Sequence, residues 1–209
     1  MRSPVPGPVD GGPEPVDGLR DEPVEVEVLA SDLVYEGRVW DVRSDTVRYG
    51  GDEIVRQYVD HPGAAAIVAL DDEDRVLLIQ QYRHPIRLRD WEIPAGLLDI
   101  AGESPLETAK RELEEEADLS AAHWEPLLTI FTTPGGNDEV IHLFLARGLS
   151  HVGHAHAREA EEADIRIEWI PLTDAVTGVL AGRLRNGILA TGVLAAAESL
   201  RRGAGVAEA

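Results

Sequence analysis

A glycine-containing loop that leads into an acidic helix, between Ala95 and Leu119, constrains the fold of this chain more than any other segment. Ser104, Pro105 and Glu107 predict the helix start, because they match an N-cap, a first-turn proline and the third residue of a capping box. At about 100° per residue, the helix has two distinct faces. One is an apolar stripe for core packing, formed by Leu106, Ala109, Leu113 and Ala117. Beside it lies an acidic arc, formed by Thr108, Glu112, Glu115 and Glu116.

The acidic arc lies toward the helix C-terminus, where the helix dipole disfavours acids. Glu112 and Glu116 are one turn apart, and like charges at this spacing cost about 0.2–0.5 kcal/mol. Two interpretations follow: a solvated acidic face, or a set of oxygen ligands for a hard divalent cation. Arg111 favours the metal site, because pairing with Glu115 at i, i+4 would leave Glu112 and Glu116 for the cation.

These residues resemble the signature of the Nudix hydrolases. The family pattern is Gly, five residues, Glu, seven residues, Arg-Glu, an aliphatic residue, any residue, Glu-Glu, any residue, Gly and an aliphatic residue. Here Glu103 is followed after seven residues by Arg111-Glu112-Leu113-Glu114-Glu115-Glu116-Ala117-Asp118-Leu119. Two features depart from the pattern: six residues separate Gly96 from Glu103, and Asp118 replaces the last glycine. Neither removes a ligand, and Asp tolerates the left-handed conformation at a helix C-terminus.

The composition limits the partners and the compartment. The chain has 39 acidic and 19 basic residues, which give a formal charge of −20. This charge argues against a nucleic-acid partner, since such binding depends on Lys and Arg side chains that neutralise phosphates. There is no cysteine, so disulfides and thiolate metal sites are excluded. No apolar run approaches the ~20 residues of a membrane span and no signal-peptide pattern opens the chain, so we expect no membrane partner and a cytoplasmic location.

The sequence divides into three regions. Residues 1–23 are rich in proline, glycine and acids, and are predicted to be a disordered tail. Residues 24–60 have short alternating apolar runs and a Gly50-Gly51 turn, which predict a small antiparallel β meander. Residues 61–209 form the predicted catalytic domain, with strands at 64–70, 75–82, 126–132, 139–146 and 165–170, a polar loop at 148–164, and helices at 173–184 and 188–202 besides the acidic one. This order favours an α/β fold with a mixed sheet, and the Nudix resemblance implies an α/β/α sandwich.

Three features outside the signature resemble the ADP-ribose pyrophosphatase subfamily, over roughly residues 24–200. They are the N-terminal meander, two runs before the helix (81–85 and 92–98), and the run 133–139 followed by 161–165. The resemblance implies hydrolysis of the diphosphate bond of ADP-ribose to AMP and ribose 5-phosphate. It also implies a homodimer that exchanges the meander, with residues of both subunits in each substrate site.

The resemblance assigns a metal site to the signature. The backbone carbonyl of Ala95 and the carboxylates of Glu112 and Glu116 would hold Mg²⁺, or Mn²⁺ in its place, with Glu115 nearby. Magnesium suits this set, because it prefers oxygen ligands and takes the remainder from phosphate and water. Glu116 therefore also counts among the expected catalytic residues.

The general base is expected in a loop outside the signature. Glu162 matches the loop glutamate that takes or orients the proton of the attacking water in the subfamily. Glu139 and Glu161 compete for this role, and the alternative for Glu162 is an ordinary solvated acid. Histidines of the same loop are expected to be exposed rather than metal ligands, because Mg²⁺ disfavours imidazole: His151, His154 and His156.

Substrate contacts are expected from residues on both sides of the signature. Arg83 would bind the phosphates or the terminal ribose, and Glu92 would bind a ribose or the adenine amino group. Arg56 matches an arginine that reaches across the dimer. Each of these has a surface ion pair as its alternative. Adenine would stack on Trp40 or on the plane of Arg38. The runs 92–98 and 133–139, which resemble the subfamily, add three further expected substrate contacts, at Leu98, Gly135 and Gly136.

Two other functions remain open at the level of the sequence. One is a Nudix hydrolase of other nucleoside diphosphate sugars, such as GDP-mannose. The other is a catalytically silent Nudix domain that senses ADP-ribose or ligands derived from NAD. The complete set of Arg111, Glu112, Glu115 and Glu116 favours an enzyme, since a sensor does not need it.

Overall fold

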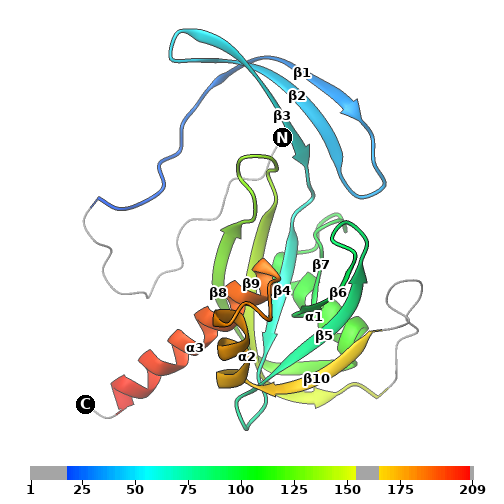
Figure 1. Ribbon diagram of the computed structural model, residues 1–209, viewed down its shortest axis with the longest axis vertical. Helices are drawn as coiled ribbons and strands as arrows, with labels where there is room; N and C mark the ends of the chain where they lie inside the picture. Colours follow the sequence, from blue (N-terminus) through cyan, green and yellow to red (C-terminus); the bar gives the residue numbers. More distant parts are fainter. Residues whose placement is uncertain (1–17, 154–164, 208–209) are drawn as a thin grey trace.

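The computed structural model describes residues 18–153 and 165–207. Most of the predicted tail therefore lies outside the described residues, and residues 18–23 are exposed and form neither helix nor strand. Figure 1 shows two parts, a three-stranded sheet and a larger α/β body, which are joined through the end of β3.

The N-terminal sheet is the predicted antiparallel meander, in the order β1-β2-β3. Its strands are longer than the sequence runs suggested, at Glu27–Tyr35, Asp41–Tyr49 and Asp52–Asp60. Gly50 and Gly51 join β2 to β3 with φ values of 61° and 94°. Positive φ at both central residues is what a tight hairpin turn between twisted strands requires. All nine residues of β1 are exposed, so this sheet has no core of its own.

The larger body contains two sheets. The first is mixed, in the order β7-β4-β9-β8, with strands at Ala95–Leu97, Ala64–Ala69, Val140–His151 and Leu119–Phe131. Its parallel pair is β4 with β9. The second is antiparallel, in the order β10-β5-β6, with strands at Arg166–Pro171, Arg75–Arg83 and Leu88–Glu92. The prediction of an α/β fold with a mixed sheet is confirmed.

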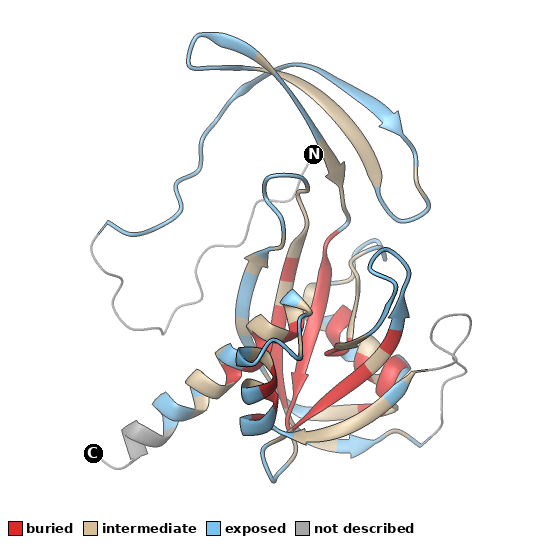
Figure 2. Cartoon of the chain, in the orientation of Figure 1, coloured by how far each residue is buried: buried red, intermediate tan, exposed pale blue. Residues whose placement is uncertain are grey.

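Helices cover both faces of β4, which is buried along its whole length (Figure 2). On one face lies α1 (Pro105–Ala117), whose Leu113 belongs to the same core cluster as Ile67 of β4. On the other, α2 (Leu172–Leu180) and α3 (Gly187–Ala207) belong to the core cluster that contains Val68 and Leu189. A central strand covered on both faces reads as a continuous apolar run, as this one does. The described part of the chain contains no helix long and apolar enough to cross a membrane.

Several elements differ from the sequence expectation in length or existence. Strand β8 begins at Leu119, directly after the α1 cap, where the sequence suggested a start near residue 126. Strand β9 continues to His151, into the predicted polar loop, because Ser150 pairs with Ser120 of β8. Strands β6 and β7 have five and three residues, which is too short for a periodic pattern to reveal.

Candidate active site

The acidic helix begins and ends as its sequence predicts. Ser104 accepts a hydrogen bond from the Glu107 backbone at 3.3 Å, and Glu107 accepts one from the Ser104 backbone at 2.8 Å. Asp118 caps the other end in the left-handed conformation, with φ 55° and ψ 35°. The departure from glycine at this position therefore leaves the helix end intact. The cap also places Leu119 at the first pairing position of β8.

Two glutamates of α1 meet the backbone of β7. Glu116 is 6% exposed, and its Oε2 accepts a hydrogen bond from the Ala95 backbone at 2.9 Å. Glu112 lies directly over Gly96, where an added Cβ atom would come 1.9 Å from Glu112 Cδ. Glycine at position 96 is therefore needed for this close approach. The expected metal residues Ala95, Glu112 and Glu116 thus lie together.

Arg111 binds three carboxylates around this pair. It contacts both oxygens of Glu103 at 3.1 Å, Glu112 at 2.5 Å and Glu115 at 3.0 Å. The hydrogen bond to Glu103 is the largest cause that raises the pKa of the Arg111 guanidinium above its usual value. The same contact lowers the pKa of Glu103. The expectation that Arg111 would hold Glu115 and leave Glu112 to the metal needs correction, since the guanidinium lies within reach of both.

The donor set fits a magnesium-type cation. Its protein groups are oxygens, two glutamate carboxylates and the backbone of a short strand, and Mg²⁺ typically uses one or two carboxylates and fills the remaining positions with water and phosphate. Within residues 18–153 and 165–207, this site included, His, Asp and Glu side chains form no cluster of three or more that could hold a metal ion, so the donor set consists of two carboxylates and the backbone. Glu115 is more exposed, with 47% of its side chain accessible, and lies at the rim.

Sequence reasoning missed Thr108 as part of this site's support. Thr108 is fully buried, and its hydroxyl donates to Glu103 Oε2 at 2.9 Å. Glu103 is thus held between Thr108 and Arg111. Its position in the acidic arc did not reveal this contact, because Thr108 donates to Glu103, five residues earlier and outside the arc.

Arg83 and Glu92, both expected to bind substrate, form an ion pair with each other. Their two hydrogen bonds are both 2.6 Å long, in the bidentate arrangement that gives Arg–carboxylate pairs their directionality. Glu92 is 5% exposed and also accepts from Gln81 at 3.3 Å. About half of the Arg83 side chain remains accessible. Arg83 therefore can offer donors to a ligand, whereas Glu92 chiefly orients it.

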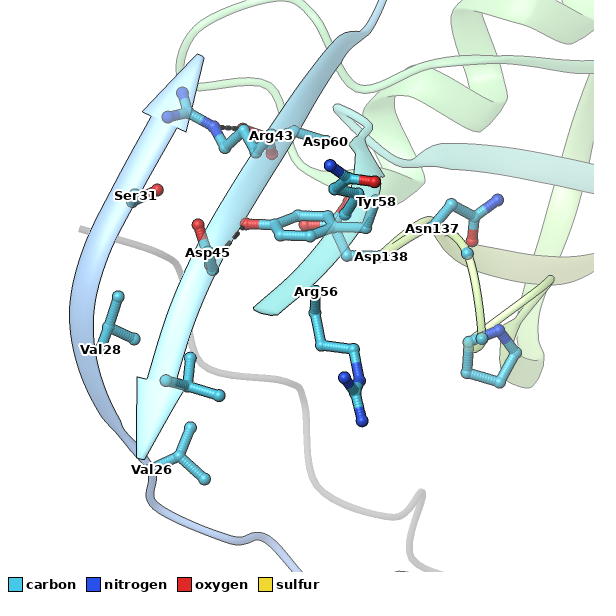
Figure 3. A pocket seen from close by; sticks show the side chains of 15 residues that line it. Val26, Val28, Ser31, Arg43, Asp45, Arg56, Tyr58, Asp60, Asn137 and Asp138 are labelled. Carbon is cyan, nitrogen blue, oxygen red and sulfur yellow. Dashed lines mark hydrogen bonds and ion pairs between the residues drawn. The ribbon is translucent and has the colours of Figure 1, made fainter. Parts of the chain in front are cut away.

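Arg56 shares a cavity of about 980 Å³ with Gly135 and Gly136, which follow β8 (Figure 3). Arg56 belongs to the wall that the meander forms, where Tyr58 also donates to Asp45 at 3.2 Å. Figure 3 shows the Arg56 side chain extending away from this pair into open space. Three expected substrate residues thus line one cavity, although they are far apart in the sequence.

Trp40 and Leu98 have different positions. Trp40 lies in the β1–β2 connection and is 43% exposed, and it does not line the Arg56 cavity as the structure describes it. Leu98 packs with the α1 core cluster, and its backbone donates to the Gly63 carbonyl at 3.1 Å. Its observed contacts are therefore those of a core residue.

Of the three expected general bases, Glu139 lies within the described residues. Glu161 and Glu162 lie outside them, as do the loop histidines His154 and His156. Glu139 follows the Gly135–Gly136 turn, and its Oε2 accepts from the Thr132 hydroxyl at 2.6 Å. Its Oε1 lies 3.5 Å from His61 Nδ1. Glu139 therefore already has two side-chain neighbours.

Comparisons with known proteins agree with this geometry. The model of the NUDIX domain matches residues 60–188. An ADP-ribose pyrophosphatase of Mycobacterium tuberculosis is 44% identical over 172 residues, which cover 82% of this chain and 83% of that protein. An ADP-ribose pyrophosphatase of Bacillus subtilis is 36% identical over 155 residues, covering 73% and 82%. A solved structure described as an ADP compounds hydrolase superposes with a TM-score of 0.72 over 88% of this chain and 98% of that chain; at 19% identity it supports the fold alone.

Proposed function

The chain belongs to the NUDIX family, and we propose on this premise that it hydrolyses the diphosphate bond of ADP-ribose, releasing AMP and ribose 5-phosphate. The observation that carries the proposal is the meeting of Glu112 and Glu116 with the Ala95–Gly96 backbone. The substrate is taken from the similarity to the two pyrophosphatases.

We propose that Mg²⁺, or Mn²⁺ in its place, is held by Glu112, Glu116 and the carbonyl of Ala95. When bound, the metal supplies a Lewis acid that lowers the pKa of water and offsets charge on the diphosphate. Arg111 keeps Glu112 and Glu115 in place through its hydrogen bonds. Glu116 is oriented by the Ala95 amide, so a rigid backbone sets its second oxygen.

The remaining roles concern the substrate and the proton. Arg83, oriented by Glu92, would bind phosphate or ribose oxygens with its accessible donors. Arg56 and the Gly135–Gly136 turn would contact the nucleoside from the shared cavity. The proposed general base is Glu162, which rests on the sequence alone. A cytoplasmic location likewise remains a prediction of the sequence.

We propose that the active form is a homodimer. Strand β1 exposes apolar side chains along its length, among them Leu33 at 49% and Val34 at 58%. A three-stranded sheet without a packed face is marginal by itself, and exposed apolar area of this kind indicates an interface. The meander of the partner subunit would then complete the substrate site through its Arg56 cavity.

A substrate panel tests the proposed activity. Purified chain is incubated with Mg²⁺ and ADP-ribose, GDP-mannose or other nucleoside diphosphate sugars, and products are identified by mass. We expect ADP-ribose to be consumed fastest and to yield AMP and ribose 5-phosphate, with little turnover in Glu112→Gln. Faster turnover of GDP-mannose would assign the other substrate class. Tight ADP-ribose binding without turnover would assign a sensor.

A further inference from the structure

The end of β3 is bound to the turn between β8 and β9 by a set of contacts that we call the junction cluster: Val59, His61, Thr132, Gly136, Asp138 and Glu139. Its backbone part is a short parallel bridge between Val59 and Asn137. The Val59 amide donates to the Gly136 carbonyl at 3.0 Å, and the Asp138 amide donates to the Val59 carbonyl at 3.2 Å. The meander is thereby tied to the turn that carries Gly135 and Gly136.

Side chains reinforce the same contact. The His61 amide donates to Asp138 Oδ1 at 2.9 Å. Glu139 Oε2 accepts a hydrogen bond from the Thr132 hydroxyl at 2.6 Å. The other oxygen, Oε1, lies 3.5 Å from His61 Nδ1. The side chains of His61 and Glu139 are 13% and 18% exposed, so they meet in a largely covered place. His61 Nδ1 accepts the Gly63 backbone amide at 3.1 Å, so His61 is a close neighbour of Glu139, and Thr132 is its hydrogen-bond donor.

The junction cluster lies between two parts of the candidate site. Arg56 is three residues before Val59 on β3, and it lines the same cavity as Gly135 and Gly136. On the other side, the Gly63 carbonyl receives the backbone amide of Leu98, in the loop that enters the signature. A shift at the junction would change the distance between the arginine on the meander and the glycine turn.

We propose that Glu139 and Thr132 are positioning residues: their hydrogen bond fixes the shape of the β8–β9 turn, which Val59 and the His61 amide join to the end of β3, and so Gly135 and Gly136 are held opposite Arg56. Glu139 then acts through the turn and does not take a proton from water. The kinetic part of this inference rests on the proposed function, whereas the geometric part does not.

A kinetic series separates positioning from base catalysis. Glu139→Gln keeps an oxygen acceptor for Thr132, so we expect kcat to stay within about threefold of the original chain. Glu139→Ala and Thr132→Val remove the contact and should raise KM about tenfold while kcat changes by less than about threefold. Thr129→Val, at an exposed threonine of β8 three residues before Thr132, is the matched control for Thr132→Val.

Two results would overturn the inference. A loss of about 100-fold or more in kcat for Glu139→Gln is the size expected for a general base and would give Glu139 that role. An unchanged KM in both Glu139→Ala and Thr132→Val would show that the junction does not position the substrate residues. If the original chain does not hydrolyse ADP-ribose, the proposed function fails and the geometric test below decides the junction alone.

The geometric test uses the absence of native cysteine. Spin labels at Tyr49→Cys on the meander and Leu180→Cys at the end of α2 occupy exposed positions, at 57% and 74%. Labelled chains are diluted with unlabelled chains so that a dimer holds one labelled pair. We expect one narrow distance distribution, retained in Glu139→Gln and broadened in Glu139→Ala and Thr132→Val. Identical distributions in all of these chains would refute the junction's role.

Discussion

Strands β1 and β4 show the contrast between the two parts of this molecule. Every residue of β4 is buried, with helices over both faces, whereas every residue of β1 is exposed. Both are rich in apolar side chains, so hydrophobicity alone does not explain the difference. The body completes its core within one chain, while the meander presents apolar side chains that no layer of the described residues covers. Chemistry is therefore assigned to the body and assembly to the meander, and each prediction below tests that division.

The largest effect is expected at the metal site. Glu112→Gln and Glu116→Gln should each lower turnover at least about 100-fold, because a neutral amide is a poor Mg²⁺ ligand. Steady-state kinetics at saturating Mg²⁺ measures this, and circular dichroism and sedimentation should show an unchanged fold and assembly. Glu114→Gln, on the same helix but outside the acidic arc, is the control. Near-normal turnover in both variants would eliminate the proposed site.

A similar loss is expected at the proposed base. Glu162→Gln should lower kcat about 100-fold or more with a much smaller rise in KM, because removal of a general base acts on the chemical step. Metal affinity, measured by Mn²⁺ titration with electron paramagnetic resonance, should hardly change. Glu161→Gln is the neighbouring control. If Glu161→Gln is the more damaging variant, the base is the adjacent glutamate.

Disruption of the meander should act on assembly first. Leu33→Lys combined with Val34→Lys places two charges at exposed apolar positions of β1. We expect a shift from dimer to monomer in sedimentation velocity and a loss of activity of about tenfold, as the partner's residues leave the site. Leu180→Lys, on the body, should leave the assembly unchanged.

The dimer prediction has two clear failures. One is a monomer at micromolar concentration with full activity in the original chain. The other is full activity in a chain that lacks residues 1–59. Either would mean that the body is complete without the meander and that the contrast between β1 and β4 has no functional consequence.

The smallest effect concerns acid stability at Glu103. Arg111 lowers the pKa of this carboxyl in the folded chain, so ionised Glu103 adds stability above its ordinary value of 4.5. That contribution is lost as the pH falls through the lower, folded-state pKa. The melting temperatures of the original chain and Glu103→Gln should therefore differ at pH 7, and the difference should shrink as the pH falls below 4.5. A difference that stays constant throughout the acid range would contradict the pairing.

The spacing of residues 95–119 determined the helix, its caps and its acidic face before any tertiary contact was known. Ser104, Glu107 and Asp118 act within a few residues of their partners, so local sequence suffices to place them. The apolar run at residues 64–70 similarly predicted the strand that the structure has as β4. These are short-range or periodic signals, and the structure confirms them.

Tertiary structure alone decided which side chains meet. Glu116 reaches the Ala95 amide across 21 residues, and Asp138 reaches the His61 amide across 77, through strand register that no periodicity encodes. Arg83 and Glu92 were each expected to bind substrate, with a surface ion pair as the alternative, and they pair with each other because β5 and β6 lie side by side. The open face of β1 was equally out of reach, since alternation in a sequence marks a strand but does not say what packs against it. Local geometry is encoded along the chain, whereas these contacts depend on the packing of distant segments.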